Sequence, residues 1–301
     1  MARTDQYLSE TDIRSRRAKT WTVRASDRDR RPWLADSPVC PLLKEYRIVH
    51  LGVASMPAPF EIVRTKLGGS YFLACFGGEG RVVIDGRLKR CRPGQAFLLP
   101  PGTRHAFHTP KGKQWNFCWV RFQENAGQQP VANTNSPVLA DFDAEPLRLA
   151  TMGLYHECSR DRVAAAIDGW LKLVLDYVLR FAEPRRIDER IYGLWQKVAA
   201  DLRRDWTNAE MAREVHLSEK QLERLCRREL GRTPRQQLIW LRMRRAAELL
   251  TDDARKVATV AAEVGYENPF VFSTVFKRCM GWSPSEHASR VRATELLRQG
   301  T

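Results

Sequence analysis

Short β-prone runs separated by turn residues fill much of the first half of the chain. Asp85-Gly86, between two such runs, is a strong signal for a tight hairpin, because a two-residue turn of this kind needs φ > 0. Short strands at such regular spacing predict a small β-barrel or double-sheet jelly roll over residues 33–125. The runs are Tyr46–Leu51, Phe60–Lys66, Tyr71–Phe76, Gly80–Ile84, Arg87–Arg92, Gln95–Leu99, Arg104–His108 and Trp115–Phe122.

The period of the apolar residues becomes helical after the barrel. The helical period runs from Ala144 to Phe181, with apolar residues from Val163 to Phe181 at intervals of three and four. This predicts one amphipathic helix, preceded by a loop, within residues 126–182. This helix can pack on the barrel or against a second copy of the chain, so a homodimer is an open alternative. Residues 183–188 contain Pro184, which ends the helical pattern, and are expected to be a linker.

The two ends of the chain are polar. Residues 1–32 alternate in charge sign and contain few apolar residues, so we expect a flexible basic arm there, with an auxiliary DNA contact as an open alternative. Residues 291–301 are expected to be a tail. The sequence has no secretory signal and no apolar run near the ~20 residues that a membrane span needs, so a cytoplasmic protein without a membrane partner is expected.

A short unit occurs twice between Met211 and His287. Each copy has a short helix, a turn, an N-cap residue (Ser218 or Asn268), a second helix and a terminating glycine. This pattern predicts a pair of helix-turn-helix motifs within residues 189–290. The corresponding positions include Leu222 and Phe272, Leu225 and Val275, Arg228 and Arg278, Gly231 and Gly281, and Pro234 and Pro284.

The predicted exposed face of the second helix is polar and basic in the first unit, whereas in the second unit it also includes the apolar Phe270 and Val271. Two such helices held by a rigid connector would fit successive major grooves, about 34 Å apart. The net charge of +15 agrees with a polyanionic partner, but much of the excess precedes the repeat, so the pattern locates the site better than the charge does. The predicted contacts to double-stranded DNA are Lys220, Gln221, Glu223, Arg224, Arg227, Arg228, Asn268, Phe270, Val271, Thr274, Lys277 and Arg278.

The repeat region resembles the DNA-binding domain of the AraC/XylS family of bacterial transcription regulators. The resemblance implies base contacts by Lys220, Glu223 and Arg224, and recruitment of RNA polymerase by an activator. Glu223 could equally be an exposed residue that pairs with Arg227. Thr274 stands where the family often has Arg, so the second helix is expected to discriminate less, and Phe270 could pack instead of contacting DNA. The resemblance rests on Ala212, Ser218, Leu222, Arg224, Leu225, Gly231, Thr233, Pro234, Arg242, Ala246, Leu249, Leu250, Ala261, Val264, Gly265, Tyr266, Phe272, Ser273, Phe276, Lys277, Gly281 and Pro284.

The predicted barrel is similar to the cupin-like sugar-sensing domain of the same family. The run from Arg92 to His105, with its Pro-Pro-Gly turn, and the aromatic strand after it carry this similarity. It implies an α+β multidomain protein with a small-molecule effector, a carbohydrate, bound in the barrel. The implied ligand-binding residues are Arg64, His105, Phe107, Phe117 and Trp119.

A metalloenzyme is the main alternative for a cupin-like barrel. A metal needs three or four converging ligands, and no histidine lies between His50 and His105, so neither a metal nor a cofactor is expected. The chain is therefore not expected to be an enzyme. Two other readings stay open: a cupin enzyme with an appended DNA-binding domain, and a regulator without ligand that is controlled by its abundance or by a partner protein.

Overall fold

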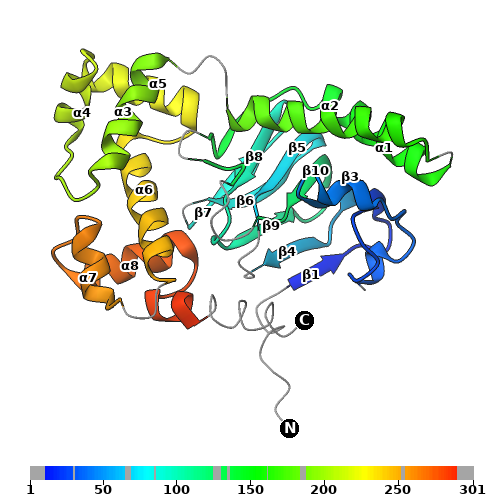
Figure 1. The fold of residues 1–301 in the computed structure, drawn as a ribbon, viewed down its shortest axis with the longest axis horizontal. Helices are drawn as coiled ribbons and strands as arrows, with labels where there is room; N and C mark the ends of the chain where they lie inside the picture. The colour runs from blue at the N-terminus through cyan, green and yellow to red at the C-terminus, as the bar shows by residue number, and fades with distance from the viewer. Residues whose placement is uncertain are drawn as a thin grey trace, which may run out of the picture.

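The structure, a computed structural model, shows an N-terminal β-sandwich covered on one side by two helices, followed by an all-helical region (Figure 1). Residues 1–10 of the predicted arm, residues 184–187 of the predicted linker, the predicted tail and Asp85 lie outside the described residues. The structure describes residues 11–29, 31–64, 69–84, 86–124, 130–133, 136–160, 162–183, 188–251 and 255–289.

The sandwich consists of a five-stranded sheet in the order β1-β4-β9-β6-β7 and a six-stranded sheet in the order β11-β8-β5-β10-β3-β2. Each predicted β-prone run overlaps a strand. β6 and β7 form the predicted hairpin, with Ile84 opposite Arg87 and Gly86 at φ 73°. The strands are β1 Thr11–Arg14, β2 Lys19–Arg24, β3 Ile48–Pro57, β4 Phe60–Arg64, β5 Tyr71–Gly78, β6 Gly80–Ile84, β7 Arg87–Cys91, β8 Gln95–Leu99, β9 His105–Thr109, β10 Gln114–Phe122 and β11 Leu139–Asp141, with short 3-10 helices η2 Pro32–Leu34 and η3 Pro41–Lys44.

Strands β1 and β2 correct the prediction of a flexible arm. β1 pairs with β4, and β2 pairs with β3, where Val23 lies opposite Leu51 and is fully buried. The prediction is therefore wrong for residues 11–24. The prediction failed because the many Arg and Asp residues around β2 make the segment polar on average. The short strand itself contains the buried apolar residue Val23.

The helical segment after the barrel is two helices, α1 (Glu145–Ser159) and α2 (Ala164–Ala182). Their apolar faces cover the outer face of the six-stranded sheet and share one core with it. Arg162, at φ 55°, interrupts the predicted single helix, and Val163 is an exposed N-cap residue, not part of the buried face. Most buried apolar residues of these two helices thus pack on the sandwich.

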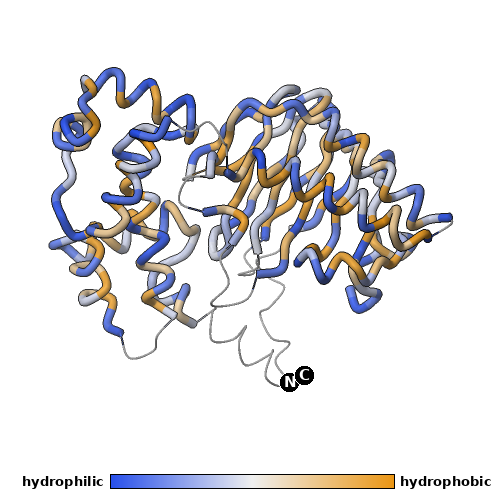
Figure 2. Tube along the Cα trace, turned by 45° about the horizontal axis from the view of Figure 1, so that its top comes forward, coloured by the Kyte–Doolittle hydropathy of each residue, from blue (hydrophilic) through white to orange (hydrophobic). Residues whose placement is uncertain are grey.

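The C-terminal helices form two small cores that share one helix. The first half of α6 packs with α3, α4 and α5, and its second half packs with α7 and α8. Figure 2 shows these helices alternating between hydrophilic and hydrophobic positions along their length, as expected for helices with one buried face. The helices are α3 Glu189–Ala200, α4 Asn208–Glu214, α5 Glu219–Leu230, α6 Pro234–Leu249, α7 Val257–Glu263 and α8 Pro269–Met280.

The helical region contacts the sandwich at the ends of α5 and α8. The backbone N–H of Val138 donates to the carbonyl of Leu230 over 3.4 Å, and that of Arg104 donates to the carbonyl of Met280 over 3.2 Å. Leu230 and Met280 are the last residues of their helices. Carbonyls at a helix end have no partner inside the helix, so the sandwich satisfies them.

Candidate DNA-contacting helices and effector pocket

Helix α5 is capped at both ends and has one polar face. Ser218 accepts from the N–H of Gln221 over 3.3 Å, and the Gln221 side chain accepts from the N–H of Ser218 over 3.0 Å. This capping box begins the helix, and Gly231, at φ 68°, ends it as predicted. The apolar side chains of α5 enter the core, which leaves the outer face to polar residues.

The predicted DNA-contacting residues of α5 are at the surface, where a polyanion can reach them. Lys220 and Arg224 are exposed, whereas Glu223 is half-buried and accepts from Arg227 Nε over 2.9 Å. The alternative in which Glu223 pairs with Arg227 is thus present in the structure, and a cytosine contact would require Glu223 to leave Arg227. The exposed residues of this set are Lys220, Gln221, Arg224, Arg227 and Arg228.

Helix α8 presents an apolar tip. Asn268 Oδ1 accepts from the N–H groups of Phe270 over 2.8 Å and Val271 over 3.3 Å, which caps the helix. Phe270 is 84% exposed and Val271 52% exposed, so the alternative in which Phe270 packs inside the domain is wrong. Thr274 Oγ1 donates to the carbonyl of Phe270 over 3.0 Å, which uses its proton within the helix. Lys277 and Arg278 are exposed one turn later.

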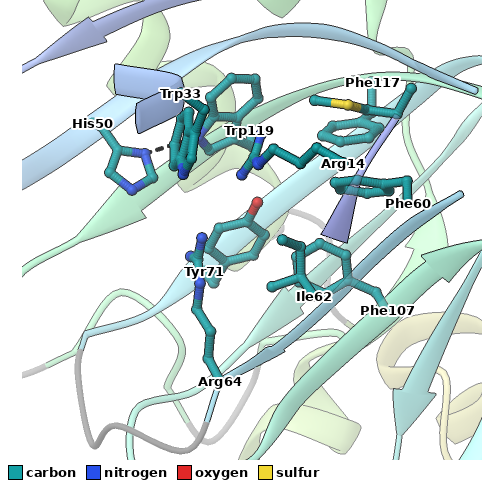
Figure 3. Close-up of a pocket in the computed structure, with 11 residues that line it drawn as sticks. Arg14, Trp33, His50, Phe60, Ile62, Arg64, Tyr71, Phe107, Phe117 and Trp119 are labelled. Atoms are coloured by element: carbon teal, nitrogen blue, oxygen red, sulfur yellow. Dashed lines mark hydrogen bonds between the residues drawn. The ribbon is translucent and has the colours of Figure 1, made fainter. Parts of the chain in front are cut away.

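The pocket lies between the two sheets and is walled by aromatic rings (Figure 3). Four predicted residues, Arg64, Phe107, Phe117 and Trp119, line it. His105 does not: its Nε2 lies 3.2 Å from the carbonyl oxygen of Pro100, and burial lowers its pKa to about 4. His105 lies opposite Arg64 in the β4–β9 pair and is a buried, neutral structural residue.

Several lining residues were not predicted. On β4, Phe60, Ile62 and Arg64 alternate along the strand and face the pocket together, so the period of two around Arg64 could have identified the first two. Arg14 was missed because its segment was assigned to a flexible arm. The unpredicted lining residues are Arg14, Trp33, His50, Met56, Phe60, Ile62 and Tyr71.

His50 is held neutral beside the pocket. Trp119 Nε1 donates to His50 Nδ1 over 2.9 Å, so that nitrogen is an acceptor. Burial lowers the pKa of His50 well below its usual value, and the positive charges of Arg121, Arg64, Arg31 and Arg14 lower it further. The cations at this end of the sandwich are therefore guanidinium groups, not imidazolium.

No group of three or more His, Cys, Asp or Glu side chains with a metal-binding arrangement occurs among the residues that the structure describes. All the cysteines but Cys279, which is half-buried, are buried. In the described part of the chain, no helix is long and apolar enough to span a bilayer.

Comparison with known proteins agrees with both parts of this structure. The AraC-like ligand binding domain matches residues 69–192, and a helix-turn-helix domain matches residues 211–290. The arabinose operon regulatory protein of Escherichia coli K12 is 30% identical over 232 residues, which cover 69% of this chain and 76% of that protein. The MmsAB operon regulatory protein of Pseudomonas aeruginosa is 25% identical over 284 residues, covering 85% and 87%. The lactose operon transcription activator of Staphylococcus xylosus is 26% identical over 228 residues, covering 70% and 80%.

A sensor sandwich joined to a duplicated helix-turn-helix unit defines a DNA-binding transcription regulator with a ligand-binding domain. The chain belongs to the AraC family of transcription regulators, which are not enzymes. The predicted family and the predicted combination of a cupin-like domain with an all-helical one are confirmed.

Proposed function

We propose that this regulator reads two successive major grooves with α5 and α8. The observation that carries the proposal is the matched pair of capped helices, each with its buried face in its own core and its polar or solvent-facing side outward. Lys220, Glu223 and Arg224 supply base contacts, and Arg224 can bond a guanine through two donors. Lys277 and Arg278 contact phosphates, while Phe270 and Val271 offer thymine methyl groups an apolar surface.

The effector of this regulator occupies the pocket between the two sheets. Arg64, Phe107, Phe117 and Trp119 contact it there, with the additional lining residues Arg14 and Tyr71. The proposed effector is a sugar or sugar derivative, since an indole face stacks on sugar C–H groups and guanidinium groups donate to oxygen. Relatives named for the arabinose and lactose operons support this choice.

The proposed outcome of effector binding is transcription activation through RNA polymerase in the bacterial cytoplasm. One relative is named as a transcription activator, which supports the sign of regulation. Two chains can form a homodimer through α1 and α2. Most apolar residues of these helices face the sandwich, but Leu149 on α1 and Leu173 on α2 are 55% and 43% exposed and offer an apolar contact to a second chain. Sedimentation of the purified chain tests this last part.

Selection of genomic fragments by the purified protein tests the function. We expect enrichment of sites with a pair of conserved half-sites spaced by about one helical turn, 10–10.5 base pairs. Fluorescence anisotropy on the enriched site, with and without pentoses, hexoses and uronic acids, then measures the effector response. Enrichment without sequence preference contradicts specific reading. A preference that no small molecule alters supports the regulator without ligand.

A further inference from the structure

The pocket contains a buried guanidinium without a matching anion. Arg64, on β4, is 7% exposed, and its Nη1 has no hydrogen-bond partner among the described residues. Its guanidinium carbon lies 5.7 Å from the centroid of the Tyr71 ring. A buried charge of this kind is costly unless an acceptor pairs with it. Arg64 is therefore prepared for an acceptor that enters the pocket from outside.

Asp12 and Asp29, two carboxylates in the described part of the chain near this pocket, already accept hydrogen bonds from other side chains. Asp12 accepts from Arg14 Nε over 2.6 Å and from Trp33 Nε1 over 3.1 Å. Asp29 accepts from Arg31 Nε over 2.9 Å. Neither aspartate is among the residues that line the pocket. The guanidinium groups of Arg121, Arg64, Arg31 and Arg14 all lower the pKa of His50.

The lining is rich in donors and poor in acceptors. Among the described lining residues there is no Asp, Glu, Asn, Gln, Ser or Thr. A neutral sugar has hydroxyl protons to donate and needs such acceptors, whereas a carboxylate only accepts. Arg14 and Arg64 offer N–H groups, and burial raises the pKa of Tyr71 to about 12, so its phenol remains a neutral donor.

The rest of the pocket lining is mostly aromatic. Trp33 and Trp119 lie with their ring centroids 6.3 Å apart at 66°, and Phe60 and Phe117 lie 5.8 Å apart. Arg14 places its guanidinium carbon 3.8 Å from the centroid of Trp33. Figure 3 shows Tyr71 between the side chains of Arg14 and Arg64, with Trp33 and Trp119 on one side and Phe60, Phe107 and Phe117 on the other. The guanidinium of Arg14 thus lies against the aromatic wall, and that of Arg64 lies beside Tyr71.

We infer that the effector of this pocket is a small carboxylate, bound through its anion by Arg64 and Arg14, with its ring against the aromatic wall. This inference rests on the proposed function, because it takes the pocket as the effector site, and it narrows that proposal to acidic ligands. A sugar acid and an aryl carboxylate share this chemistry.

Matched pairs of probes test the charge preference on the full chain. D-galacturonate is compared with D-galactose, and benzoate with benzamide, at equal ionic strength, by thermal shift and by calorimetric titration. At least one acid should raise the Tm by roughly 2–4 °C. It should also bind about tenfold or more tightly than its neutral partner, the usual ratio for a charge-assisted hydrogen bond. The pair that shows the difference indicates whether the group attached to the carboxylate is a sugar ring or an aryl ring.

Arg64→Met removes the proposed anion site, and Arg92→Met, an exposed arginine outside the pocket, is the control with the same charge change. Arg64→Met should abolish the preference for the acid and, without ligand, should have a Tm at least as high as that of Arg92→Met, because an uncompensated buried charge is gone. Arg64→Lys should retain part of the preference.

Three results would overturn the carboxylate inference: no acid that binds better than its neutral partner, an acid preference that survives Arg64→Met, or an effector-free Tm for Arg64→Met well below that of the control. Failure of the proposed function is distinguishable. If the proposed effector control is wrong, an acid binds at Arg64 but leaves the affinity for the operator unchanged. If a neutral sugar alters the affinity for the operator, the proposed effector control is supported and the carboxylate inference is refuted.

Discussion

The guanidinium of Arg244, on α6, donates a hydrogen bond from Nη1 to the carbonyl oxygen of Ala132 over 3.1 Å. These residues lie 112 positions apart, in the helical domain and in the sensor domain. Together with the backbone hydrogen bonds at Leu230 and Met280, this contact holds the shared helix of the two reading units against the sandwich.

Arg244→Met should loosen the contact between the domains. The substitution removes the donor to the carbonyl of Ala132, which should weaken the association of the two domains by about 1–3 kcal/mol. We expect the two domains to unfold in separated transitions in scanning calorimetry, where the wild type shows a single or closely coupled one. Arg245→Met is the control, because Arg245 is exposed and its hydrogen bond goes to Glu248 on the same helix. Equal thermograms for both variants would contradict the bridging role.

Arg224→Ala should relax sequence preference at one base pair of the operator, with a loss of roughly 1–3 kcal/mol of discrimination. Lys277→Ala should instead weaken binding to all sequences and reduce the salt slope by about one. Binding titrations over several salt concentrations and over single-base operator variants separate the two effects. An unchanged base preference in Arg224→Ala would refute the assigned readout.

Trp119→Phe should reduce the effector response without reducing DNA affinity. The change shortens the aromatic wall and removes the Nε1 donor that His50 Nδ1 accepts over 2.9 Å. The loss of this hydrogen bond beside the pocket should weaken effector binding by about tenfold. Calorimetric titration of the effector and anisotropy on the operator are the measurements. Parallel losses in both would point to a folding defect, which circular dichroism would reveal.

Acid should destabilise the folded chain before its carboxylates titrate. Burial lowers the pKa of His105 and that of His287 to about 4, from an ordinary value of 6.5. Between these values the unfolded chain binds protons that the folded chain does not, so stability decreases as pH falls from 6.5 toward 4. The slope approaches roughly 1 kcal/mol per pH unit for each histidine.

Urea unfolding at pH 7, 6 and 5 measures this dependence. His105→Gln, whose amide can donate to the Pro100 carbonyl in place of the ring, should have a shallower slope than the wild type. A wild-type stability that is flat between pH 7 and 5 would contradict the prediction.

The elements with strong local signals were predictable. Ser218, Asn268, Gly231 and Gly281 mark helix ends through their own backbone chemistry, and the structure places them there. Strands β1 and β2 could not be predicted in this way, because short strands are stabilised by partners distant in sequence, as Val23 is by Leu51 opposite it. Arg14 was not predicted as a pocket residue for the same reason, since it reaches the pocket through the pairing of β1 with β4.

The contact between Arg104 and Met280 lies next to His105, which is opposite Arg64 in the sheet. The end of α8 and the anion site are thus joined through one strand pair. If α8 must leave Arg104 to enter a major groove, the operator competes with the sandwich for this helix. Linkage is reciprocal, so the operator must then change the affinity for the effector by the same factor by which the effector changes the affinity for the operator. DNA would be an allosteric ligand of the pocket.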